Sequence, residues 1–179
     1  MKLSLLCILL GLGVSLFSIP GLIKPKSFTQ IIRQFPRSLV AGYILVALAT
    51  AWFLYYLKLE SISDFAAYKP TMLMGFAVLG GMTCVFVTDF LAIRGLAILF
   101  MLLAKLMVDT AHLADSSWRL VIVTWAYLLV FAGMWFTISP WRMRDFIHWT
   151  TASETRLRII SLVRLAFGLL VLGLGIFVF

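Results

Sequence analysis

Lys105, Asp109 and His112 are the residues of this 179-residue chain whose types and spacing come closest to a chemical site. Intervals of four and three residues put the three side chains on one face of a helix. The segment from Leu91 to Val108 is otherwise almost entirely apolar. A lone charge in hydrocarbon costs at least about 2.5–3.5 kcal/mol on insertion scales, so such residues normally find partners. A proton, ion or ligand site is one use of this face.

A structural explanation of the same face competes with the site, and it is the one we favour. Lys105 and Asp109 are four residues apart and can neutralise each other along the helix. Alternatively, the helix ends early, so that Asp109, His112 and Asp115 belong to an aqueous outer loop toward which Lys105 extends. Either explanation makes the polar face a feature of stability.

A second set of charges lies near helix ends. Asp89 and Arg94 frame a short turn between two apolar segments, and Arg164 lies just inside the last apolar segment. We expect structural ion pairs, Asp89 with Arg164 or Asp89 with Arg94, that orient the ends of these helices. The two arginines can equally reach lipid phosphates.

The remaining chemistry-bearing residues predict no catalytic centre, cofactor or metal site. His112 and His148 fall near opposite faces of the expected membrane domain, so one chain cannot ligate a haem with both. Cys7 and Cys84 are expected on differently oriented helices at different depths, which argues against a disulfide. No Ser or Cys has a base and an orienting acid in its sequence context. We therefore favour a protein that is not an enzyme.

The elements that must position these residues are membrane-length apolar segments. Hydrophobic residues make up 63% of the chain, charged residues only 12%, and the mean hydropathy is +1.09. Crossing the hydrocarbon core of a bilayer takes about 20 apolar residues in a helix. The sequence thus predicts an all-α integral membrane protein in which residues 1–179 form one domain. The expected spans are residues 3–19, 38–57, 71–88, 91–108, 118–138 and 159–179.

We expect these six transmembrane helices to form a bundle of three hairpins, with two short amphipathic helices in the membrane interface. All five prolines should lie at or beyond the ends of the spans. Residues 1–57 and 118–179 share a plan of helix, interfacial helix and helix, which duplication and convergence explain equally well. The apolar and aromatic residues expected at the interface are Phe28, Ile31, Ile32, Phe35, Trp141, Phe146, Ile147 and Trp149.

Most of the 15 lysines and arginines lie in short stretches between the apolar segments, which is an orientation signal rather than a nucleic-acid footprint. They are more frequent in residues 20–37, in residues 139–158 and at Arg94 than on the opposite side. Because cytoplasmic loops collect Lys and Arg, we expect both termini outside, in a bacterial inner membrane. A cleaved signal peptide is the competing interpretation of the first span, but no small-x-small cleavage site follows it.

These features favour a non-enzymatic polytopic membrane protein, an accessory, scaffolding or assembly subunit that binds other membrane proteins or lipids. The short loops leave no room for a soluble catalytic domain. One alternative is a small transporter or proton-linked channel that uses Lys105, Asp109 and His112. Another is a membrane enzyme or redox subunit acting on lipid or quinone. The expected partners are the lipid bilayer and other membrane proteins, not nucleic acid, and the sequence is compatible with a homo-oligomer.

Overall fold

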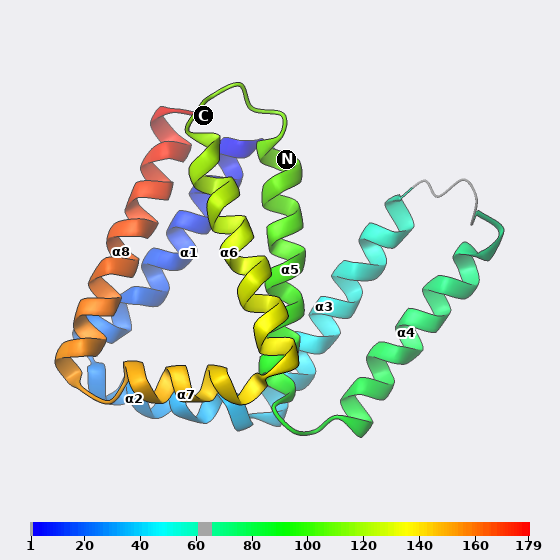
Figure 1. The fold of residues 1–179 in the computed structure, drawn as a ribbon, viewed down its shortest axis with the longest axis horizontal. Coiled ribbons are helices and arrows are strands. Elements are labelled where there is room, and N and C mark those ends of the chain that lie inside the picture. The colour runs from blue at the N-terminus through cyan, green and yellow to red at the C-terminus, as the bar shows by residue number, and fades with distance from the viewer. Residues whose placement is uncertain (1, 61–65) are drawn as a thin grey trace.

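A computed structural model describes residues 2–60 and 66–179, and within these ranges the chain forms helices and no strands. Six helices of the described chain are long and apolar enough to cross a membrane. Two short helices lie across one end of the bundle, which we call the α2–α7 end (Figure 1). The elements are α1 (Leu3–Ile23), α2 (Pro25–Gln34), η1 (Phe35–Arg37), α3 (Leu39–Leu59), η2 (Ala66–Tyr68), α4 (Lys69–Phe86), α5 (Leu91–Ala111), α6 (Arg119–Ile138), α7 (Pro140–Thr150) and α8 (Glu154–Phe177).

The expected helix boundaries are wrong at one proline. Pro20 lies inside α1, which continues to Ile23, instead of beyond its end. The helix tolerates the proline there because only its last turn follows, and the chain resumes helical bonding with the Lys24 amide donating to the Pro20 carbonyl at 3.0 Å. The extension also brings Gly21 against α8, where a Cβ on the glycine would contact Ser161.

The longest interface joins α1 and α8, which run antiparallel from one end of the bundle to the other (Figure 1). Both helices present small residues to each other, so their backbones approach closely. A Cβ on Gly11 would lie 2.6 Å from the Leu172 amide nitrogen and 2.7 Å from the Gly168 carbonyl oxygen. A Cβ on Gly175 would lie 2.9 Å from the Cys7 Cβ. Glycine is therefore required at these contacts by the space available.

Helix α5 is the centre of the rest of the fold, because it packs against both α6 and α3. Gly133 of α6 faces the Ala97 carbonyl, and Gly95 of α5 faces the backbone of α3 at Val46. A cluster of buried residues joins α5 and α6 to the α1–α8 pair toward the end opposite α2 and α7. It consists of Leu3, Leu6, Cys7, Ala104, Met107, Ala111, Ile122, Ala126 and Val171.

The three expected hairpins are not the packed pairs of the structure. The extensive interfaces join α1 with α8, α5 with α6, α3 with α5, and α3 with α4. The two helices of each expected hairpin, α1 and α3, α4 and α5, or α6 and α8, do not share such an interface. The physical reason in the first and last cases is the intervening short helix, which separates the spans that it connects. Helices that are far apart in the sequence, such as α1 and α8, therefore pack together, as do consecutive long helices such as α5 and α6.

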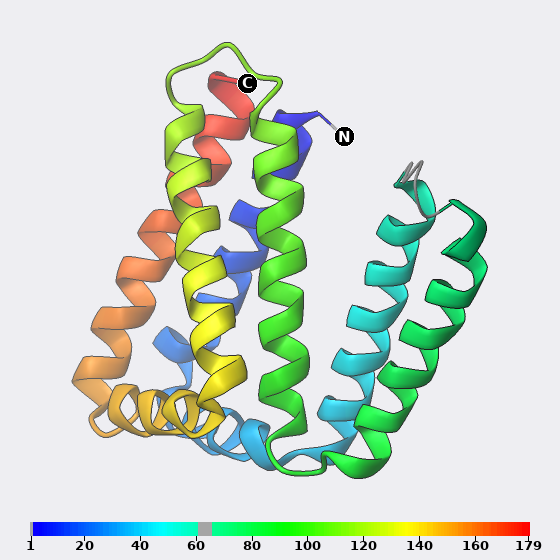
Figure 2. The same ribbon diagram turned by 45° about the vertical axis from the view of Figure 1, so that its right-hand side comes forward.

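Helices α3 and α4 form an arm beside the main bundle (Figure 2). In the arm, Phe53 and Phe76 pack edge to face with ring centroids 5.0 Å apart, and Gly80 lies against Thr50. Helix α4 has no buried residue, although it is long and apolar. Helices α3 and α5 meet near the α2–α7 end and diverge toward the other end (Figures 1 and 2). In this part of α5, the side chains of Lys105 and Asp109 are about half exposed.

Candidate functional site

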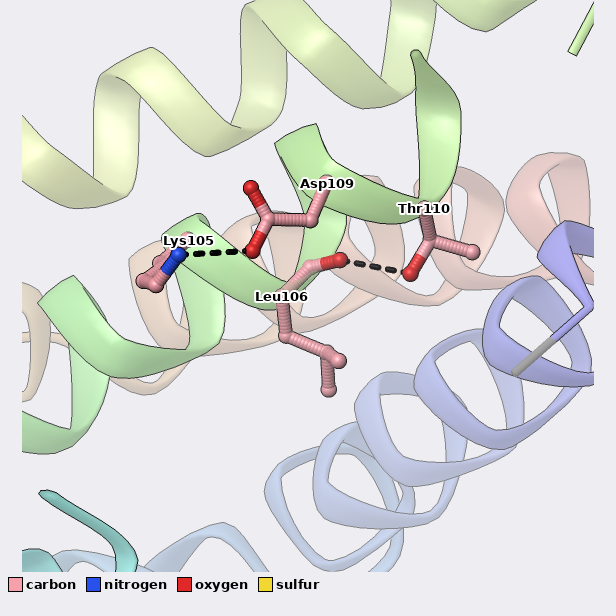
Figure 3. A network of polar contacts seen from close by, with 4 residues as sticks. All are labelled: Lys105, Leu106, Asp109 and Thr110. Atoms are coloured by element: carbon pink, nitrogen blue, oxygen red, sulfur yellow. Dashed lines mark hydrogen bonds and ion pairs between the residues drawn. The ribbon is translucent and has the colours of Figure 1, made fainter. Parts of the chain in front are cut away.

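Lys105 and Asp109 form an ion pair on α5, with 2.8 Å between Lys105 Nζ and Asp109 Oδ2 (Figure 3). Helix α5 continues to Ala111, so Asp109 belongs to the helix and the expected early helix end is wrong. At 1.5 Å per residue, Lys105 lies about 9 Å inside this end of the helix. Both side chains remain about half exposed, at 46% and 54%. The pairing expected from the sequence is present.

An aromatic side chain from α3 borders the pair. Lys105 Nζ lies 5.4 Å from the centroid of the Tyr56 ring, within the range of a cation–π interaction. Trp52 stacks on Tyr56 with ring centroids 6.3 Å apart. The charged face of α5 is thus directed to the side where α3 diverges. Tyr56 was not predicted from the sequence, although three aromatic residues, Trp52, Tyr55 and Tyr56, lie close together in this part of the chain.

His112 and Asp115 do not join the pair. His112 follows the last residue of α5 and is exposed, and Asp115 lies in the loop before α6. Beside the pair, the Thr110 hydroxyl donates to the Leu106 carbonyl at 2.6 Å, a bond internal to the helix (Figure 3). The structure therefore brings together two of the three expected residues. These two can hold a charge or bind a polar group.

The expected ion pairs of Asp89 are wrong, because no salt bridge of the described chain includes it. Asp89 is exposed in the turn before Phe90, whose backbone is left-handed with φ 54°. Arg94 instead extends toward α6, where it donates to the Thr137 carbonyl at 3.5 Å. Arg164 donates to the Ser18 hydroxyl at 3.2 Å. Both arginines thus lie at helix–helix contacts, while the carboxylate faces outward.

Arg164 also lies over an aromatic ring of α1. Its guanidinium carbon is 4.9 Å from the centroid of Phe17, and its partner Ser18 donates to the Val14 carbonyl at 2.7 Å. The hydroxyl therefore accepts from the arginine while it donates to its own helix. This arrangement ties α8 to α1 near the α2–α7 end, so the structure gives Arg164 a packing role.

The two short helices are tied to each other through Arg33. Its Nε donates to the Thr151 hydroxyl at 2.8 Å, and its Nη2 donates to the Thr151 carbonyl at 3.0 Å. Helix α2 begins at Pro25 and α7 begins at Pro140, so each short helix has a proline in its first turn. The two helices form one platform at the α2–α7 end (Figure 1).

The expected interfacial residues divide between the two sides of this platform. Phe28 and Ile147 are buried against the bundle. Four others are exposed and can contact an apolar environment: Ile31, Trp141, Phe146 and Trp149. Ile32 and Phe35 are partly buried. Placement of this face in a membrane interface remains a prediction.

Within residues 2–60 and 66–179, no three His, Cys, Asp or Glu side chains are grouped to hold a metal ion. His112 follows the end of α5 and His148 lies in α7, at opposite ends of the bundle, and Cys7 and Cys84 are free thiols. The chain matches no family model, no curated protein and no solved structure.

Proposed function

We propose that this chain is a non-enzymatic multi-pass membrane protein, an accessory, scaffolding or assembly subunit that holds a partner membrane protein. The observation that carries the proposal is the exposed Lys105–Asp109 pair inside an apolar helix. Ionisable groups at membrane depth normally face protein or water, because exposure to lipid is costly. A partner helix that supplies a polar group beside the pair would remove that cost.

The α3–α4 arm supports this role. Among the long helices of the described chain, α4 packs extensively against α3 alone, and none of its residues is buried. Lipid alone can cover an apolar helix, so the arm by itself does not require a partner. The open side of α5 next to the arm, with Lys105 and Tyr56 facing each other across it, does favour one. We further propose a bacterial inner membrane, with the α2–α7 end in the cytoplasm and both termini outside, on the distribution of basic residues.

Site-specific photocrosslinking in intact membranes tests the proposal. A photoreactive residue at Val78 of α4, which is 54% exposed, should give a reproducible product with one partner protein. The matched control is Leu128 of α6, which is 62% exposed on another side of the bundle. The double substitution Lys105→Met and Asp109→Asn should abolish the product at position 78 while the chain still inserts. Equal crosslinking at both positions, unaffected by the substitutions, would contradict the proposal.

The exposed pair also motivates a second candidate, a small transporter or proton-linked channel that uses Lys105 and Asp109. It differs from the first in needing no other protein. Proteoliposomes that contain the chain alone should then move a solute or protons, and Lys105→Met should abolish the flux without loss of insertion. Flux by the purified chain, combined with no partner in the crosslinking experiment, would replace the first proposal by this one.

A further inference from the structure

A surface cavity of about 330 Å³ lies where the junction of α1 and α2 meets the beginning of α8. Its charged lining residues are Lys24, Lys26 and Arg158 together with one carboxylate, Glu154. The cavity is therefore positively charged overall. From the sequence, these basic residues indicated only the orientation of the chain in the membrane. Lys24 and Arg158 are too far apart along the chain for their proximity to be predicted.

Two helices begin at the cavity, and neither has a side chain that caps it. The first helical bond of α2 runs from the Phe28 amide to the Lys24 carbonyl at 3.0 Å. The amides of Lys26 and Ser27 consequently have no partner within α2, and Lys24 provides no side-chain cap. At α8, Ser153 likewise makes no capping bond. Free amides and the positive end of the helix dipole both favour an anion at such a place.

The ion pair within the cavity is loose. Lys26 Nζ lies 3.9 Å from Glu154 Oε1, and the side chains are 87% and 52% exposed. Exposed pairs of this kind contribute little to stability, so an incoming anion can displace the contact at small cost. Glu154 itself acts as a competing anion, because it is the one carboxylate lining a cavity with three cations.

We propose that this cavity binds a phosphate-bearing anion through Lys24, Lys26, Arg158 and the free amides of α2. The source is either the headgroup of an anionic phospholipid or a soluble phosphate monoester. The lipid source rests on the membrane placement proposed above, since the cavity lies at the α2–α7 end together with the exposed aromatic residues of the platform. Basic side chains at headgroup depth are suited to lipid phosphates.

Native mass spectrometry of the full chain in mild detergent tests the proposal with phosphatidylglycerol and with glycerol phosphate as probes. Lys26→Gln and Arg158→Gln should each weaken binding by about fivefold, the typical effect of one basic residue at an anionic surface. Arg142→Gln is the matched control, because Arg142 is exposed on the same platform, carries the same charge and does not line the cavity. It should leave the affinity unchanged.

Glu154→Gln tests whether removal of the carboxylate strengthens or weakens binding of the anion. If the carboxylate competes with the ligand, its removal tightens binding, whereas a purely structural Lys26–Glu154 pair predicts weaker binding. Binding of phosphatidylglycerol that glycerol phosphate does not displace identifies the lipid source, and displacement identifies the soluble source. No binding of either probe, or equal losses in Arg142→Gln and Arg158→Gln, overturns the proposal. Circular dichroism verifies that each variant is folded.

The result is separable from the test of the proposed function. Lys26→Gln should leave the crosslink at Val78 intact, because the cavity and the α4 face lie on different elements. Loss of phosphate binding with retention of the crosslink therefore concerns the cavity alone.

Discussion

Alanine at Gly11 should weaken the α1–α8 interface far more than alanine at Gly13, two residues along the same helix. A Cβ at Gly11 would lie 2.6 Å from one backbone atom of α8 and 2.7 Å from another, whereas a Cβ at Gly13 meets nothing within 4 Å. Both changes gain the same helix propensity, up to about 1 kcal/mol, so this gain cancels in the comparison. The difference then reports the cost of forcing the two backbones apart, about 1–3 kcal/mol.

The difference can be measured by reversible unfolding of the two variants in mixed micelles, followed by the helical signal and, with the other five tryptophans replaced by phenylalanine, by the fluorescence of Trp125. This residue suits the purpose because its ring packs edge to face on Phe167 of α8, with centroids 5.0 Å apart. The same comparison applies at the other end of the interface, where a Cβ on Gly175 would be crowded and one on Gly173 would not. Equal unfolding free energies for Gly11→Ala and Gly13→Ala would refute the close approach of α1 and α8.

Three further predictions address the α2–α7 end. Arg33→Gln should destabilise the fold by about 1 kcal/mol, because it loses two partly buried hydrogen bonds to Thr151, and equal loss in Arg37→Gln would contradict this. Phe90→Val should cost about 1–2 kcal/mol and Phe90→Asn less, since asparagine tolerates the left-handed backbone; unfolding measurements rank the two. In a cysteine-free background, cysteine at Gln30 or His148 should react with an impermeant reagent only from the cytoplasmic side, and labelling from outside would reverse the proposed orientation.

The number and approximate length of the helices follow from the sequence because hydropathy over membrane-length segments is a local property. The 105–109 pairing is predictable for the same reason, since both residues belong to one helix. Which helices pack together cannot be predicted in this way. Gly11 and Gly168 mark flat faces in the sequence, but nothing local indicates that these faces meet.

The same limit applies at other sites. Ala47 with Ala51 and Ala77 with Gly81 have spacings like those of true contacts, yet all four are exposed. Opposite charge suggested a partner for Asp89, but the turn directs this carboxylate outward. Tyr56 beside Lys105, and the convergence of Lys24 with Arg158, depend on helix placement, which short-range patterns do not encode.

The union of α1 with α8 has a consequence for biogenesis. The ribosome makes α1 long before α8, so in the membrane placement proposed above the small-residue face of α1 has no partner through most of translation. Until α8 is made, this packing face is exposed to other helices, and in a truncated product it would stay exposed. Synthesis of α8 is thus the step that covers this face of α1.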